Sequence, residues 1–92
     1  MNEFQALADR ELTAMRRAIA LGKVTAFADE AARLSELVQR RRLDHGAAID
    51  GLWEAADANN LLGQHSIEFV QLLLSDAFGQ EQPAPLWMVR AA

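Results

Sequence analysis

The chain has 92 residues, a net charge of −4 and no cysteine. This length suits one compact domain and is too short for two, and the lack of cysteine excludes disulfide bonds, thiolate metal sites and cysteine nucleophiles. The acidic balance argues against a general nucleic-acid-binding protein.

A first helix is predicted over residues 3–21, because apolar side chains recur there every three or four positions. These side chains are Phe4, Leu7, Ala8, Leu12, Met15 and Ile19. Asn2 is a suitable N-terminal cap, and Gly22 stands where helices commonly end in a left-handed residue. We therefore expect the chain to leave this helix through Gly22.

A second helix is predicted over residues 26–41, with Thr25 as its cap. Its apolar face consists of Phe27, Ala31, Leu34 and Val38, and the opposite face carries Asp29, Glu30, Arg33, Glu36 and Arg40. Asp29 with Arg33, and Glu36 with Arg40, are acid-before-base pairs four residues apart. Each such pair stabilises a helix by roughly 0.3–0.5 kcal/mol.

A third helix is predicted to begin after Asp44, whose carboxylate suits the cap position and the positive end of the helix dipole. Gly46 and Gly51 lower the helix propensity and are candidate points of close helix approach. Asn59-Asn60 is expected to end the helix, because Asn tolerates the left-handed conformation. The buried stripe consists of Ile49, Leu52, Trp53 and Ala56.

Leu61 and Leu62 follow in a short connection, from which we expect them to fill the core. A fourth helix is predicted from a cap at Ser66 to an end at Gly79. Its apolar residues cover almost the full circumference: Ile67, Phe69, Val70, Leu72, Leu73, Leu74, Ala77 and Phe78. A helix of this kind belongs in the middle of a bundle or at an interface, and we expect it at the centre.

Residues 80–92 differ from the rest, because Pro83 and Pro85 favour extended backbone and the apolar run Leu86–Val89 follows them. Such a tail either docks on its own domain or contacts a partner. Both alternatives stay open for Trp87, whose ring beside Met88 has the composition of a binding hot spot. The predicted fold is all-α: a small four-helix bundle over residues 1–79, with an extended C-terminal tail over residues 80–92.

The sequence contains no recognisable arrangement of catalytic or metal-binding residues. His45 and His65 lie near predicted helix starts, where we expect them to face water. Asp50, Glu54 and Asp57 share one side of the third helix, which favours a solvated face or an acidic docking surface over a metal site. The sequence has no glycine-rich phosphate loop and no Gly-x-Ser-x-Gly motif. We therefore predict no enzyme activity, no cofactor and no metal.

Arg40-Arg41-Arg42 is the most conspicuous polar feature. Together with Arg33, and with Arg10, Arg16, Arg17 and Lys23 as further candidates, it forms a candidate binding surface, because guanidinium groups bind phosphates and carboxylates. Alternatively, these arginines only complement the helix dipole and bond its free carbonyl groups. Residues 1–42 hold eight Lys and Arg against six Asp and Glu, whereas residues 43–92 hold one against seven. Two electrostatically different surfaces are therefore expected.

The stretch from Gly22 to Phe78 resembles the small helical module that follows the catalytic domain in phage- and plasmid-type primase and primase–polymerase proteins. Lys23-Val24 replaces the Arg-Asn of that family's turn, Asn60 replaces a Gly, and the primase catalytic domain is absent. The resemblance implies a helical fold and a mobile-element origin more than an activity. The matching segments are Gly22-Lys23-Val24-Thr25, residues 37–43, Leu52-Trp53-Glu54-Ala55-Ala56 through Asn60-Leu61, and Ser75-Asp76-Ala77-Phe78.

We favour a non-enzymatic helical binding protein of phage or mobile-element origin that acts through protein–protein contact. Its alternatives are an anti-CRISPR-like inhibitor of a host defence complex, a replication-associated module that contacts nucleic acid through Arg40–Arg42, and a homo-oligomeric adaptor. No apolar run approaches the roughly 20 residues that span a bilayer, and the start Met1-Asn2-Glu3-Phe4 is unlike a signal peptide. We therefore expect a cytoplasmic protein with no membrane partner.

Overall fold

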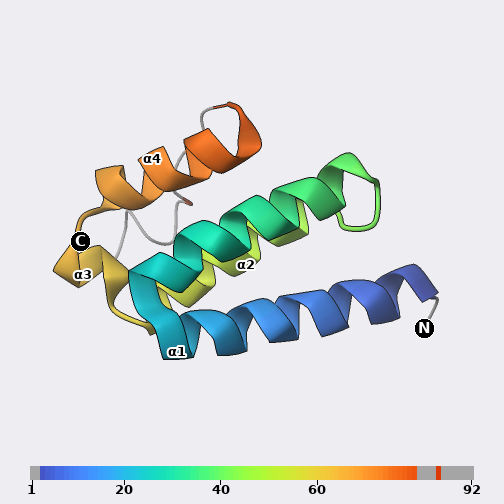
Figure 1. Cartoon of the computed structure of the whole chain (residues 1–92), viewed down its shortest axis with the longest axis horizontal. Coiled ribbons are helices and arrows are strands. Elements are labelled where there is room, and N and C mark those ends of the chain that lie inside the picture. The colour runs from blue at the N-terminus through green and yellow to red at the C-terminus, as the bar shows by residue number, and fades with distance from the viewer. Residues whose placement is uncertain (1–2, 81–84, 86–92) are drawn as a thin grey trace.

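The computed structural model describes residues 3–80 and residue 85. They form four helices: α1 (Glu3–Gln39), α2 (His45–Ala58), α3 (Leu61–Gln64) and α4 (Ile67–Phe78) (Figure 1). No strand occurs in this part of the chain, so the predicted all-α helical bundle is confirmed. Nor does any helix among the described residues have the length and apolarity needed to cross a membrane.

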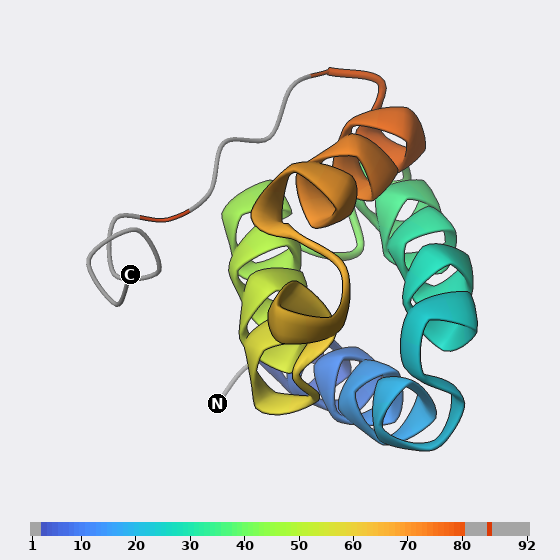
Figure 2. The ribbon, with the colours of Figure 1, turned by 90° about the vertical axis from the view of Figure 1, so that its left-hand side faces the viewer.

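Helix α1 is a hairpin of two helical halves. Lys23 has φ 55° and ψ −131°, outside the helical region, and at this point the N-terminal half (residues 3–22) folds back along the C-terminal half (residues 24–39) (Figures 1 and 2). The two halves correspond to the helices predicted over residues 3–21 and 26–41.

The predicted role of Gly22 was wrong, because Lys23 and not Gly22 has the positive φ. Gly22 is needed for space instead. A Cβ atom on Gly22 would lie 2.6 Å from the Cβ of Ala26, closer than real Cβ contacts come. Gly22 therefore allows the chain to approach Ala26 closely, and Lys23 has the unusual backbone angles.

The ends of α2 and α4 follow the predicted capping chemistry, whereas Thr25, predicted as a cap, lies inside the second half of α1, and Asn2 lies outside the described residues. The Asp44 carboxylate accepts a hydrogen bond from the backbone N–H of Ala47 at 3.0 Å, and the Ser66 hydroxyl accepts one from Phe69 at 3.0 Å. Asn60, with φ 58°, and Gly79, with φ 74°, are left-handed as predicted. These caps satisfy backbone groups that helix ends otherwise leave free.

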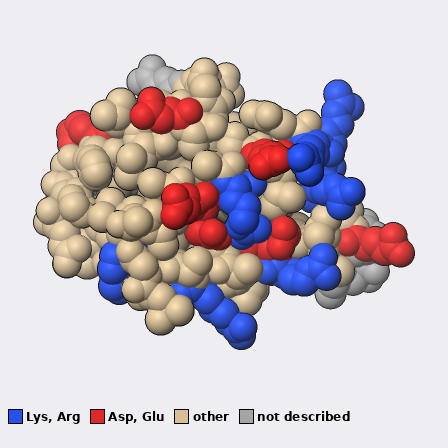
Figure 3. Space-filling view, viewed as in Figure 1, with Lys and Arg blue, Asp and Glu red and all other residues tan. Residues whose placement is uncertain are grey.

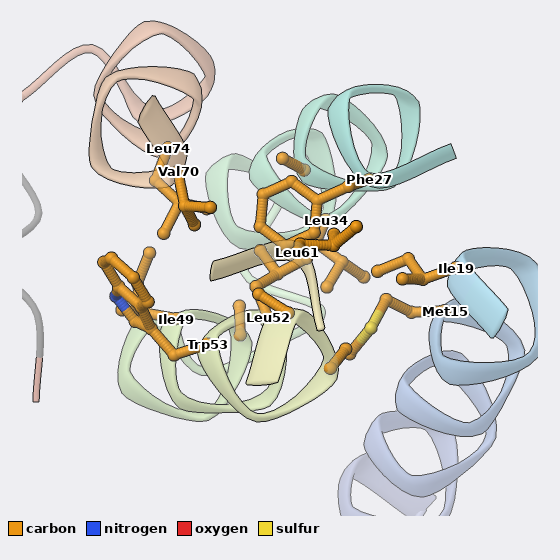
Figure 4. Close-up of a cluster of buried hydrophobic side chains, with 14 of the residues drawn as sticks. Met15, Ile19, Phe27, Leu34, Ile49, Leu52, Trp53, Leu61, Val70 and Leu74 are labelled. Carbon is orange, nitrogen blue, oxygen red and sulfur yellow. The ribbon is translucent and has the colours of Figure 1, made fainter. Parts of the chain in front are cut away.

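The core lies between the two halves of α1, α2, α3 and α4 (Figure 4). Its largest fully buried side chains are Met15, Ile19, Phe27, Leu34, Leu52, Trp53, Leu61, Val70 and Leu74. Leu61 enters from the short helix α3, as expected for this connection. A Cβ on Gly51 would lie 3.2 Å from both Leu12 and Met15, so Gly51 lets α1 approach α2 closely, as predicted.

The expectation that the fourth helix is central was wrong. Only Val70 and Leu74 of α4 are buried, and Leu72 is 60% exposed. Figure 2 shows the reason: α4 forms one side of a ring of helices whose other sides are α2 and the halves of α1, with α3 between them. A helix on the edge of such a ring buries one stripe only, so the outer apolar residues of α4 remain partly open to solvent.

Candidate binding surface

Arg40, Arg41 and Arg42 form a tight turn directly after α1, which we call the basic turn. The backbone N–H of Arg42 donates to the Leu37 carbonyl at 2.9 Å, and that of Arg41 donates to the Val38 carbonyl at 3.0 Å. This pair of bonds is the Schellman motif, which closes a helix C-terminus through its backbone. On the far side, Leu43 is buried and anchors the turn in the core.

Arg41 occupies the position in this motif that normally requires glycine. Its φ is 60°, in the left-handed region, where a residue with a Cβ loses roughly 1–2 kcal/mol. Because the backbone N–H groups of Arg41 and Arg42 already close the helix, their side chains are not needed as caps. Within residues 3–80 and 85, neither guanidinium group makes a hydrogen bond or an ion pair.

All three side chains of the basic turn are exposed. Arg40 pairs with Glu36 across one helical turn, with 2.6 Å between Nη2 and Oε1, as predicted. The two side chains are 66% and 60% exposed, and such surface pairs contribute little stability because water and salt screen them. Arg40 is therefore free to exchange Glu36 for another carboxylate at small cost.

Arg33 lies apart from the basic turn, in an ion-pair cluster that joins the halves of α1. Its guanidinium contacts Glu30 at 2.8 Å and Glu11 at 3.2 Å, and it also donates to the Glu11 backbone carbonyl. The hydrogen bonds that Arg33 donates to Glu30 raise the pKa of Arg33 against the opposing effect of burial, with further contributions from the charges of Glu30 and Glu11. The predicted pairing of Arg33 with Asp29 was wrong. Glu30, three positions earlier in the chain, and Glu11, on the facing half of α1, bind the guanidinium group instead.

Charge is distributed unevenly over the molecule. All eight Lys and Arg of the described residues lie within residues 3–42, while residues 43–80 carry six Asp and Glu and no Lys or Arg. In Figure 3 one group of blue basic atoms lies at the upper right, over the turn between α1 and α2, and others lie at the centre and along the lower edge. The basic turn is therefore the strongest concentration of positive charge on a predominantly acidic molecule.

One of the two histidines differs from the prediction. His65 is exposed as expected, and its ring lies 4.9 Å from that of Phe69. His45 is half-buried: its Nε2 atom is buried without a hydrogen-bond partner, and its ring stands nearly perpendicular to that of Phe78 with centroids 5.5 Å apart. Packing of the α4 C-terminus over the start of α2 causes this burial.

Two further features could not be predicted from the sequence. The Trp53 Nε1 donor is buried without a hydrogen-bond partner. A hollow of about 370 Å³ lies between α1 and α2, with Arg16 and Glu54 as its charged lining residues. Its other lining residues are Ala20, Ala55, Ala58 and Asn59. This hollow contains no nucleophile with an adjacent base, so it offers no catalytic arrangement.

The acidic residues of α2 lie on the exposed surface. Asp50, Glu54 and Asp57 are exposed, and no group of three or more His, Cys, Asp or Glu suited to a metal ion occurs among the described residues. Trp87, Met88 and the proposed docking of the tail lie outside the residues that the structure describes. No protein-family model, curated protein or solved structure matches the chain.

Proposed function

We propose that the chain is a non-catalytic binding protein whose basic turn docks on a carboxylate-rich surface of a protein partner. One observation carries this proposal: Arg41 and Arg42 project from a turn held at both ends, and their guanidinium groups have no partner within the described part of the chain. An arginine presents a rigid planar fork of donors that matches a carboxylate with two parallel hydrogen bonds.

The backbone of the basic turn is already ordered before a partner arrives. The hydrogen bonds of Arg41 and Arg42 to α1, and the buried Leu43, fix where each side chain leaves the surface. Binding therefore orders only the arginine side chains, and each immobilised side chain costs about 0.5–1.5 kcal/mol. Arginine is also among the residues enriched in binding hot spots, where truncation costs about 2 kcal/mol or more.

A protein partner fits the surroundings of the basic turn better than nucleic acid does. Asp44 follows two residues after Arg42, Glu36 lies one turn before Arg40, and every charged residue from 43 to 80 is acidic. A nucleic acid presents a continuous line of phosphates, and binding it requires an extended basic surface. A protein surface can offer a local group of carboxylates that matches three arginines and avoids the neighbouring acidic residues.

The test compares an acidic peptide with DNA as probes. Three probes are titrated into isotope-labelled protein at near-physiological salt: a peptide of glutamates, a duplex oligonucleotide and a single-stranded oligonucleotide. Amide chemical shifts are followed by NMR. The variant Arg40→Ala/Arg41→Gly/Arg42→Ala removes the basic turn, and glycine at 41 relieves the left-handed backbone. The matched control Arg10→Ala/Arg16→Ala/Arg17→Ala removes the same charge from three exposed residues of α1.

We expect the peptide to shift residues 40–42 in the wild type and the control, and to lose at least about tenfold in affinity for the basic-turn variant. Equal binding by the two variants would show that only net charge matters and would refute a defined site. A DNA complex that weakens steeply with salt and disappears in the basic-turn variant would replace the protein partner by nucleic acid.

A further inference from the structure

The two halves of α1 are joined by a single non-helical residue. Lys23 alone departs from helical geometry within Glu3–Gln39, with φ 55° and ψ −131°. The rest of this segment suits one continuous helix, because it contains no proline and only one glycine, Gly22. The residues on either side of Gly22 and Lys23 are therefore compatible with a straight helix as well as with the predicted break, and the hairpin departs from helical geometry at one position.

Nothing local makes Lys23 a good residue for this turn. Its backbone lies in a region that glycine adopts readily and residues with a Cβ rarely adopt. The one hydrogen bond of its side chain, from Nζ to Asn59 Oδ1 at 3.1 Å, lies on the exposed surface, where such bonds contribute little. The turn is therefore strained, and the strain is released if Lys23 becomes helical.

We propose that Lys23 is a hinge through which two copies of this chain exchange the N-terminal halves of α1. In the exchanged dimer α1 runs straight for 37 residues, a length of about 55 Å at 1.5 Å per residue. The longest dimension of the single copy is 37 Å. Residues 3–22 of each copy then pack on α2 and on residues 24–39 of the other copy. Short hinge segments under strain are known to favour such exchange.

The contacts of the N-terminal half can all re-form between copies. They include the Glu11–Arg33 ion pair at 3.2 Å, the approach of Met15 to Gly51, and the burial of Ile19 in the core. The N-terminal half lies at the outside of the bundle (Figure 1), so it can leave without displacing another helix. Exchange therefore keeps the core filled and removes the strained turn from both copies.

Substitutions at Gly22 and at Lys23 should shift the equilibrium between the hairpin and the exchanged dimer in opposite directions. In the hairpin, a Cβ at residue 22 would lie 2.6 Å from the Cβ of Ala26. In a straight helix, Cβ atoms four residues apart are about 6 Å from each other, so alanine fits. Glycine at residue 23 has the reverse effect, because it adopts the hairpin backbone without strain and weakens a continuous helix.

The experiment measures the mass of the full chain by light scattering over about a hundredfold range of concentration. We expect wild type to form dimers at the high end, Gly22→Ala to tighten dimerisation at least about tenfold, and Lys23→Gly to weaken it by a similar factor. Lys23→Ala is the matched control: it removes the side chain and keeps the strain, so its dimerisation stays within about threefold of wild type.

A dimer alone does not prove exchange. In a mixture of labelled and unlabelled protein, exchange predicts an isotope-filtered NOE between the Met15 methyl group of one copy and Gly51 of the other. Absence of that NOE in a dimer, equal dimerisation of wild type and Lys23→Gly, or monomers throughout for both wild type and Gly22→Ala would each overturn the proposal. If Gly22→Ala does not fold, the comparison of wild type with Lys23→Gly decides.

Discussion

Replacing Arg41 by glycine should stabilise the fold while weakening the proposed binding. Arg41 has φ 60°, and its backbone N–H and that of Arg42 close α1; glycine keeps both bonds. The variant gains the roughly 1–2 kcal/mol that a residue with a Cβ loses in the left-handed region. It loses about 0.5–1 kcal/mol because glycine makes the unfolded chain more flexible.

The midpoints of these two ranges give a net gain of about 0.75 kcal/mol, which for a domain of this size raises Tm by about 3–6 °C. Thermal and urea unfolding followed by circular dichroism measure this gain. Arg42→Gly is the matched control, since it removes the same charge one residue later, where φ is not positive. Glycine at 42 has no strain to relieve and should cost about 0.4–1 kcal/mol.

A gain of stability in Arg41→Gly together with a loss in Arg42→Gly would confirm that the Arg41 side chain is dispensable for the fold. Loss of stability in Arg41→Gly equal to that in Arg42→Gly would refute the reasoning, because the Arg41 side chain would then stabilise its own domain. In the peptide titration, Arg41→Gly should bind less tightly than wild type although its fold is more stable. Partial unfolding cannot explain weaker peptide binding in a variant whose fold is more stable.

Three further predictions concern the rest of the fold. Arg33→Met should lower the free energy of unfolding by about 1 kcal/mol, a value discounted for the partial exposure of the ion-pair cluster, and should leave peptide binding unchanged. Because the pKa of Arg33 is raised, its charge and its contribution to stability persist from neutral to mildly alkaline pH and are lost only in strong alkali. Urea unfolding at several pH values tests this. Leu74→Ala should cost about 2–5 kcal/mol in urea unfolding, whereas Leu72→Ala, on the exposed side of α4, should stay within about 0.5 kcal/mol; equal losses would contradict the edge position of α4. Ser66→Ala should lower the free energy of unfolding by about 1 kcal/mol, because the first turn of α4 loses its cap, and a Tm shift below about 1 °C would contradict that role.

The elements of the fold were predictable because they depend on local rules. Apolar spacing located the helices, and the hydrogen bonds of Asp44 and Ser66 confirm the predicted caps. The edge position of α4 was not predictable from its own residues, since burial depends on what the other helices leave uncovered. Leu72 and Leu74 are chemically identical, and only the packing of the other helices decides that one is 60% exposed and the other buried.

The candidate site was predictable in composition but not in geometry. Three consecutive arginines are visible in the sequence, yet the left-handed backbone of Arg41 and the separation of Arg33 depend on a turn and on a facing helix half. The resemblance to primase modules, the mobile-element origin and the lack of enzyme activity stay predictions, and so do the roles of Trp87 and Met88, which lie outside the described residues.

Both ends of the C-terminal half of α1 carry a long basic side chain where glycine would be more stable. Lys23 and Arg41 have φ 55° and 60°, while Gly22 provides space and has a negative or extended φ. A chain shaped only for stability would place glycine at 23 and 41. The strain at Arg41 is explained if its side chain contacts a partner, and the strain at Lys23 if the turn must be able to open. The double variant Lys23→Gly/Arg41→Gly should therefore be more stable than wild type, yet monomeric and weaker in binding the acidic peptide.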